Sequence, residues 1–228
     1  MSVTRFFASL KSLCAVTALL VIAVPIFAQI SDFPKPLPEV QALLDQAKPL
    51  RNANKLAEAE PLYQQALEKA RSVKDKAGEA MALAGYSLLL QRKGQLPESL
   101  KMLDEALILA REAGAKSAEA AVIQSIGMYH YSTGKPLPAA ERFEEAREIF
   151  RAIGDKVSEA GMMMNLGVIY ENTGQVTKAI PIYERVLPIF RELKNKGAEA
   201  SVLTNLAIAY NKLGKKEQAK VYKGLTNK

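Results

Sequence analysis

The sequence predicts an all-α fold in which about five helical hairpins stack into an α-solenoid. A pattern with a period of 40 residues runs along most of the 228-residue chain. In each period a glutamate is followed by alanine, a glycine stands 15 residues later, and the apolar residues between them have helical spacing. The glutamates and glycines are Glu79, Glu119, Glu159, Glu199, Gly94, Gly134, Gly174 and Gly214.

Each period is predicted to form a helix, a turn and a second helix. Glycine and asparagine tolerate the left-handed backbone that ends a helix, so the four glycines, and Asn54 in the first unit, mark the turn inside each hairpin. Pro97 and Pro138 stand where second helices are expected to begin. The predicted array covers residues 37–228, with repeats at about 39–78, 79–118, 119–158, 159–198 and a shortened 199–228.

Small residues recur at two fixed positions and predict close crossing of the paired helices. The bulky side chains that follow the second set by four residues are expected to pack as knobs into these holes. The two small sets are Ala47, Ser87, Gly127, Gly167 and Ala207, and Ala59, Ser99, Ala139, Ala179 and Ala219; the bulky set is Tyr63, Leu103, Phe143 and Tyr183.

The first 28 residues have the layout of a secretory signal peptide. Arg5 and Lys11 precede an apolar run from Leu13 to Phe27, no acidic residue occurs, and Ala28 provides a small residue at the expected cleavage site. An uncleaved membrane anchor is the alternative, but the run is shorter than the roughly 20 residues that span a bilayer. We therefore expect an exported protein, periplasmic or secreted, with a short linker over residues 29–36, and membrane contact only if the signal segment is retained.

Composition limits the chemistry of the expected mature chain. Its only cysteine, Cys14, lies in the removable segment, which excludes disulfides and thiolate sites from residues 29–228. Removal of Arg5 and Lys11 lowers the net charge from +7 to +5, an excess too modest to indicate nucleic-acid binding. We expect no cofactor and no metal.

The segment Asn165-Leu166-Gly167, followed by Tyr170, Gly174, Ala179 and Tyr183, resembles a tetratricopeptide repeat. The resemblance is to the 40-residue variants of bacterial MalT-like and CHAT-associated arrays, and it covers residues 37–228. The first two repeats depart from the pattern, with Tyr86 and Ser87 where leucine and glycine are usual. The resemblance implies a right-handed solenoid whose first helices line a concave groove for a peptide or a partner helix.

Carried onto this sequence, the resemblance implies a set of partner-binding residues in that groove. Asn165 and Asn205 fall where family members use an asparagine amide to bond a ligand backbone; the alternative is that both amides bond within the array. Of Met162, Met163 and Met164, we expect Met164 to face outward. The predicted groove residues are Gln91, Arg92, Gln124, Met128, Tyr131, Met164, Asn165, Glu171, Thr204, Asn205 and Asn211, with Val168 and Ile208 between them.

The sequence offers no catalytic constellation, so we do not expect an enzyme. His130 is the single histidine and occupies a position that holds leucine or tyrosine in other repeats, which favours packing over catalysis or metal binding. The carboxylates Glu141, Glu144, Glu145 and Glu148 alternate with Arg142, Arg147 and Arg151 at helical spacing, which predicts ion pairs on a solvated face.

The carboxyl-terminal segment is basic. We expect a protein-binding scaffold of the cell envelope or secreted space, and keep as an alternative an adaptor that binds a membrane or cell wall through this segment. A solvated cap for the last hairpin would have the same composition. The segment carries Lys212, Lys215, Lys216, Lys220, Lys223 and Lys228 against Glu217.

Overall fold

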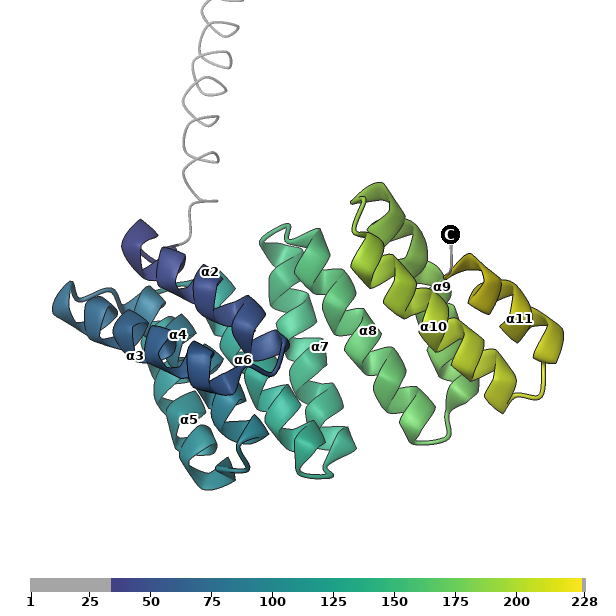
Figure 1. Cartoon of the computed structure of the whole chain (residues 1–228), viewed down its shortest axis with the longest axis horizontal. Helices are drawn as coiled ribbons and strands as arrows, with labels where there is room; N and C mark the ends of the chain where they lie inside the picture. Colours follow the sequence, from purple (N-terminus) through teal and green to yellow (C-terminus); the bar gives the residue numbers. More distant parts are fainter. Residues whose placement is uncertain (1–33, 227–228) are drawn as a thin grey trace, which may run out of the picture. The chain divides into compact units, whose positions relative to one another are not determined.

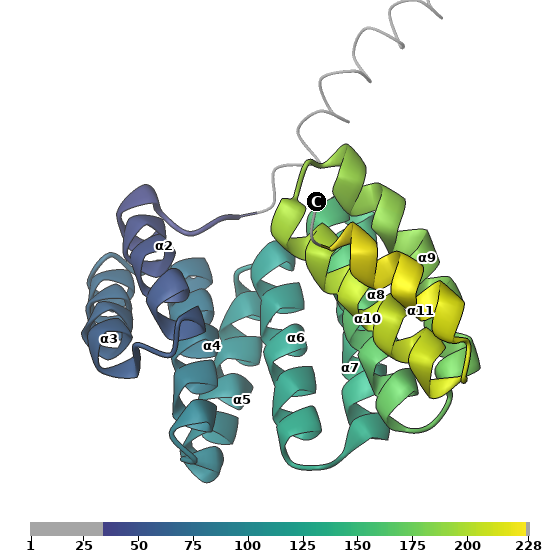
Figure 2. The ribbon, with the colours of Figure 1, turned by 45° about the vertical axis from the view of Figure 1, so that its right-hand side comes forward.

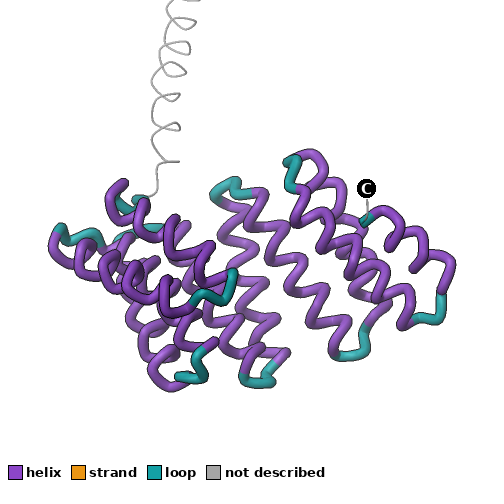
Figure 3. The backbone as a smooth tube through the Cα atoms, viewed as in Figure 1, coloured by secondary structure: helices purple, strands orange, loops and turns teal. Residues whose placement is uncertain are grey.

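The computed structural model describes residues 34–226, and this part of the chain contains ten α-helices and no strand (Figures 1 and 3). The all-α prediction is therefore confirmed. The helices are α2 (Pro38–Asn52), α3 (Leu56–Ser72), α4 (Lys76–Arg92), α5 (Leu96–Glu112), α6 (Lys116–Ser132), α7 (Pro136–Ala152), α8 (Lys156–Asn172), α9 (Val176–Glu192), α10 (Lys196–Lys212) and α11 (Lys216–Leu225).

The helices pack as successive hairpins, and each hairpin stacks on the next. The paired helices are α2 with α3, α4 with α5, α6 with α7, α8 with α9 and α10 with α11, and each second helix also packs against the first helix that follows it (Figures 1 and 2). None of the described helices is long and apolar enough to cross a bilayer. The predicted signal peptide lies outside the described residues.

Short turns with one left-handed residue join all ten helices. The turns inside the hairpins have positive φ at Asn54, Gly94, Gly134, Gly174 and Gly214, as the sequence predicts. The turns between hairpins use the same geometry, and here two of the four left-handed residues are lysines, Lys74 and Lys194. A lysine in this region of φ and ψ carries a steric cost that glycine does not.

Exchange of the left-handed residues gives a stability prediction. Lys194→Gly should raise the free energy of unfolding by about 1 kcal/mol, because φ is +53° at this position and only a side chain with Cβ is strained there. The reciprocal change Gly154→Lys, at φ +76°, should lower it by a similar amount. Urea unfolding followed by circular dichroism measures both, and equal stabilities would contradict the assignment of strain to these turns.

Close packing inside the hairpins follows the predicted alternation of small and bulky residues. A Cβ atom on Gly127 would lie 2.7 Å from the Phe143 ring, and one on Gly167 would lie 2.5 Å from the Tyr183 ring. Phe143 and Tyr183 are themselves buried. Glycine at these two positions is therefore required by the ring of the partner helix and not by the backbone of its own helix.

The first helices are not evenly packed against one another. α4 packs directly against α6, whereas α6 and α8 are connected mainly through α7, which contacts both. α4 presents Gly85 and Leu88 at the positions where α8 presents Asn165 and Val168, and each pair lines a pocket.

Candidate functional site

The first helices form a surface that we call the first-helix face, which carries two pockets; a third pocket lies within the last hairpin, between its first and second helix. One of about 170 Å³ lies among α2, α4 and α6, one of about 190 Å³ lies between α6 and α8, and one of about 790 Å³ lies between α10 and α11. The first two are each lined by residues 40 apart, such as Gln41 and Met81 in the one and Met128 and Val168 in the other.

Most of the predicted groove residues reach these pockets. Met128, Tyr131 and Asn165 line the pocket between α6 and α8, together with Val168, and the Phe143 ring contributes to its wall. Asn165 comes from α8, whereas Met128 and Tyr131 come from the last two turns of α6. Sequence spacing alone could only assign these side chains to the same face of their helices. The structure shows that side chains from two repeats line one pocket.

Some of the remaining predicted residues line a pocket, and others contact neighbouring residues of the array. Thr204 and Asn211 line the largest pocket, and Gln124 lines the pocket among α2, α4 and α6. Gln91 donates a hydrogen bond to the Ser99 hydroxyl at 3.1 Å. Met164 is half-buried while Met162 and Met163 are buried, which confirms that Met164 is the most outward of the three.

The side-chain amides of Asn165 and Asn205 are unpaired among the residues that the structure describes. Asn165 and Asn205 are both half-buried, and neither side chain forms a hydrogen bond with any residue between 34 and 226. The alternative that both amides bond within the array thus finds no support in the described residues. A half-buried amide without a partner can donate to and accept from the backbone of an extended segment.

Glu171 lies inside the array and not on the pocket surface. Its side chain is 8% exposed, accepts a hydrogen bond from the Tyr183 hydroxyl at 3.2 Å, and forms an ion pair with Lys212 at 2.7 Å. Burial and the Glu171 carboxylate both raise the pKa of the Tyr183 hydroxyl, so it remains a donor. Glu171 therefore connects two hairpins and is not available to a partner.

A recurrent contact joins the ends of successive first helices. Asn172 donates to the Tyr131 hydroxyl, and the Lys212 ammonium reaches Glu171; each contact spans 41 residues. Arg92 makes the corresponding contact at the amino-terminal end of the array, where its guanidinium donates to the backbone carbonyl of Arg51 at 2.8 Å. The last turns of the first helices are thus coupled by side chains from the next hairpin.

Arg51 and Lys48, which line the pocket among α2, α4 and α6, were not among the predicted groove residues. A signal for Arg51 was present, because it precedes Gln91 by 40 residues and occupies the same last-turn position as Tyr131, Glu171 and Asn211. The weak match of the first repeat to the pattern concealed it.

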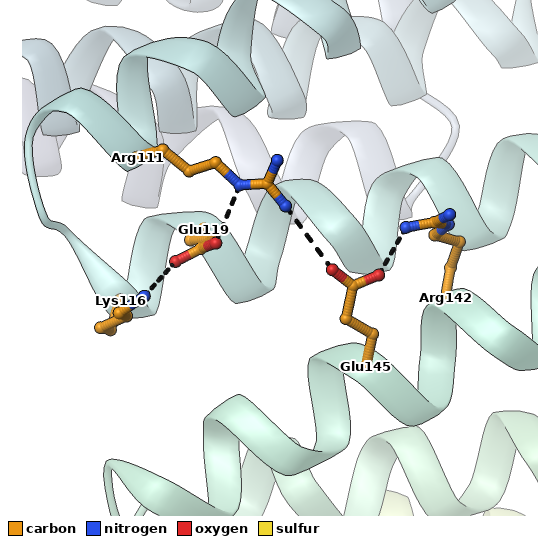
Figure 4. A network of polar contacts seen from close by, with 5 residues as sticks. All are labelled: Arg111, Lys116, Glu119, Arg142 and Glu145. Carbon is orange, nitrogen blue, oxygen red and sulfur yellow. Dashed lines mark hydrogen bonds and ion pairs between the residues drawn. The ribbon is translucent and has the colours of Figure 1, made fainter.

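Three of the four carboxylates that might suggest acid-base chemistry on α7, namely Glu144, Glu145 and Glu148, are engaged in ion pairs. Figure 4 shows Arg111 between Glu119, at 3.0 Å, and Glu145 of the next hairpin, at 3.6 Å, with Lys116 and Arg142 completing the network. Burial alone would raise the pKa of Glu119, but hydrogen bonds from Lys116 and Arg111 outweigh it and lower that pKa. The predicted ion-pair face on α7 is confirmed in the same way, by Arg147 with Glu144 and Glu148.

His130 is half-buried and packs edge-on against the Tyr129 ring. Its Nδ1 atom is buried and has no hydrogen-bond partner among the described residues. Burial lowers the pKa of the imidazole, and the positive charges of Lys135 and Arg142 lower it further, so the ring is neutral at pH 7. Within residues 34–226 no group of three histidines, cysteines or carboxylates is arranged to hold a metal ion.

Comparison with known families agrees with this architecture. A tetratricopeptide repeat model matches residues 78–152 and 158–222, which together are more than half of the chain. The chain belongs to the tetratricopeptide repeat family. No curated protein sequence gives a significant match.

Several solved tetratricopeptide structures resemble this one in fold. BtubC (BKLC) from P. vanneervenii has a TM-score of 0.67 and 22% identity, over 100% of this chain and 90% of its own. A signal transduction ATPase with a tetratricopeptide repeat sensor from Pyrococcus horikoshii has a TM-score of 0.70 and 19% identity, over 82% and 28%. A Rap protein complexed with Competence and Sporulation Factor has a TM-score of 0.60 and 16% identity, over 82% and 62%. At these identities the likeness concerns the fold.

Proposed function

We propose that this protein is a non-catalytic scaffold that holds an extended segment or a helix of a protein partner along its first-helix face. The observation that carries the proposal is the pair of half-buried amides, Asn165 and Asn205, which have no partner among residues 34–226. Asn165 adjoins the apolar surfaces of Met128 and Val168 in one pocket. Amides that fix the backbone of a ligand beside apolar subsites for its side chains suit this mode of recognition.

The fold supports the same proposal. Tetratricopeptide arrays present first-helix side chains on a rigid frame, and the Rap protein of similar fold has been crystallised with Competence and Sporulation Factor. In the present chain, carboxylates that could otherwise attract a ligand are bonded within the array. Glu171 is bonded to Tyr183, and Glu119 forms an ion pair with Arg111. The open polar groups of the first-helix face are therefore the ones that a partner meets.

Capture from an envelope extract tests the proposal. The full chain and the double variant Asn165→Ala/Asn205→Ala are used as baits, and we expect a partner that the first retains and the second loses. Gln65→Ala/Gln218→Ala serves as the matched control, because it also removes two amides, both exposed and both on second helices. Equal retention by all three baits would refute binding at the first-helix face.

We also propose that the protein acts outside the cytoplasm. The proposal is supported by the charge and apolar pattern of residues 1–28. Export in a bacterial host should yield a protein whose amino-terminal residue is Gln29, as read by mass spectrometry of the secreted or periplasmic fraction. Recovery of only the full-length chain from the cytosol would refute the proposal.

A further inference from the structure

The last hairpin, α10–α11, lacks the bulky buried side chain that each preceding second helix provides. In α8–α9 the Tyr183 ring fits so closely against Gly167 that a Cβ atom there would lie 2.5 Å from it. The residues 40 further along the chain are Lys223 and Ala207. Lys223 is exposed, so α11 places no buried side chain opposite the small residue of α10.

A pocket of about 790 Å³, which we call the last-hairpin pocket, lies at this place between α10 and α11. Its lining includes Lys223, Ala207 and Asn211, which occupy the positions of the Tyr183 side chain and of its two contacts in α8. The adjacent ring of Tyr222 stacks on a tyrosine of α10, with the centroids 5.5 Å apart, and does not line the pocket. The pocket therefore coincides with the site that a buried ring fills in the preceding hairpin.

Aliphatic groups form the apolar part of the pocket. Ala207, Ala219 and Thr226 line it and are half-buried, and Ile208, which is 42% exposed, adds its side chain. No aromatic ring is among the described residues of the lining. An aliphatic surface without a ring to stack on suits a flexible acyl chain better than a planar aromatic group.

Three lysines of α11 give the pocket a positive charge. Lys216, Lys220 and Lys223 line it, although the equivalent residues of α9 are uncharged and buried. Lys220 is paired with Glu217 at 3.0 Å, whereas the other two lysines form no ion pair within residues 34–226. No carboxylate belongs to the described lining, so the charge of the pocket attracts an anion.

We propose that the last-hairpin pocket binds a small anionic amphiphile, namely a fatty acid of medium chain length. The acyl chain lies against Ala207 and Ile208, and the carboxylate meets Lys216, Lys220 and Lys223. The pocket volume falls within the usual range of small-molecule sites, about 300–1,000 Å³. A free acid is favoured over a lipid of a bilayer because the pocket lies between the two helices of one hairpin.

Titration of the full chain with decanoate, below the concentration at which it forms micelles, tests the proposal. Methyl resonances are followed by NMR, and we expect the Ile208 signal to shift with a Kd of about 1 mM or lower. Acetate has the charge without the chain, and decyltrimethylammonium has the chain with the opposite charge; both should bind at least about tenfold more weakly. No shift of Ile208 up to about 5 mM decanoate would overturn the proposal.

Two variants fill the pocket from opposite sides. Lys223→Leu places there the residue that α5 has at this position, Leu103, and Ala207→Leu fills the pocket from α10 with every lysine retained. Each should weaken decanoate binding by at least about tenfold, and Lys223→Leu should also raise the melting temperature by about 3 °C because it buries an apolar side chain. Lys101→Leu, which replaces an exposed lysine of α5, is the matched control and should leave the affinity unchanged. Weaker binding in Lys223→Leu but not in Ala207→Leu would place the ligand on the lysines alone and overturn the pocket.

Charge variants and a second probe test the headgroup and its source. Lys216→Gln and Lys220→Gln should each weaken decanoate binding about threefold, since an exposed cation contributes little by itself. Unchanged affinity in both variants would overturn the role of the carboxylate. Binding to vesicles of anionic phospholipid without binding of monomeric decanoate would overturn the proposal in favour of a membrane surface. Asn165 and Asn205 do not line this pocket, so capture of a protein partner through their amides is an independent result.

Discussion

Replacement of Lys212 by methionine is expected to lower the free energy of unfolding by about 2–3 kcal/mol, because it leaves a buried carboxylate without its cation. Glu171 is 8% exposed and receives the Lys212 ammonium at 2.7 Å from the next hairpin. The remaining bond, from the Tyr183 hydroxyl at 3.2 Å, is too weak to compensate for the desolvated charge. Chemical unfolding monitored by circular dichroism measures the loss.

Two companion variants test the cause of this effect. Lys212→Met combined with Glu171→Gln removes the uncompensated charge and should recover most of the stability. Lys196→Met removes another ion pair of the same helix, in which Lys196 lies 3.2 Å from Glu199, but Lys196 is 87% exposed, so we expect a change within about 0.5 kcal/mol. If Lys196→Met and Lys212→Met destabilise the chain equally, burial of Glu171 is not the reason.

Two glycine-to-alanine changes in helix α8 are expected to have opposite signs. Gly167→Ala should destabilise the chain by about 1–3 kcal/mol, because the new methyl group would lie 2.5 Å from a ring atom of Tyr183. That ring cannot readily move, since it is fully buried and its hydroxyl is bonded to Glu171. Gly161→Ala meets nothing within 4 Å and should stabilise the helix by about 0.5–1 kcal/mol.

The hairpin α4–α5 supplies a rescue for the destabilised variant. It has Ser87 and Leu103 where α8–α9 has Gly167 and Tyr183, so a Cβ atom is tolerated there opposite a smaller side chain. Gly167→Ala combined with Tyr183→Leu should therefore cost less than the sum of the two single changes. Thermal melting of the unmodified chain, the two single variants and the double variant measures this. Strictly additive changes in stability would show that the ring and the glycine do not interact.

The fold was predictable because its signals are local and repeated. Gly94 and its equivalents end helices because glycine readily adopts a left-handed backbone, a preference that does not depend on the rest of the fold. The structure has positive φ at each of these glycines. The left-handed lysines, Lys74 and Lys194, escaped prediction since lysine has no preference for that conformation. There the neighbouring helices impose the geometry on the residue.

The first-helix face was predictable as a surface but not in its details. Repeat position placed Met128 and Asn165 on one side, and the structure brings them into one pocket. The same reasoning could not tell that Glu171 is covered by Lys212, because their contact joins two hairpins. It also passed over Arg51, whose repeat matches the pattern weakly.

The sequence by itself determined the helices, their turns and the side of each helix that faces the core, because these follow from residue spacing and from backbone preferences. Only the tertiary structure decided which polar groups remain free. The Asn165 amide has no hydrogen-bond partner among residues 34–226, whereas the Glu171 carboxylate is held by Lys212 and Tyr183, although both residues belong to first helices. The difference arises because Lys212 of the next hairpin, 41 residues further along the chain, reaches Glu171.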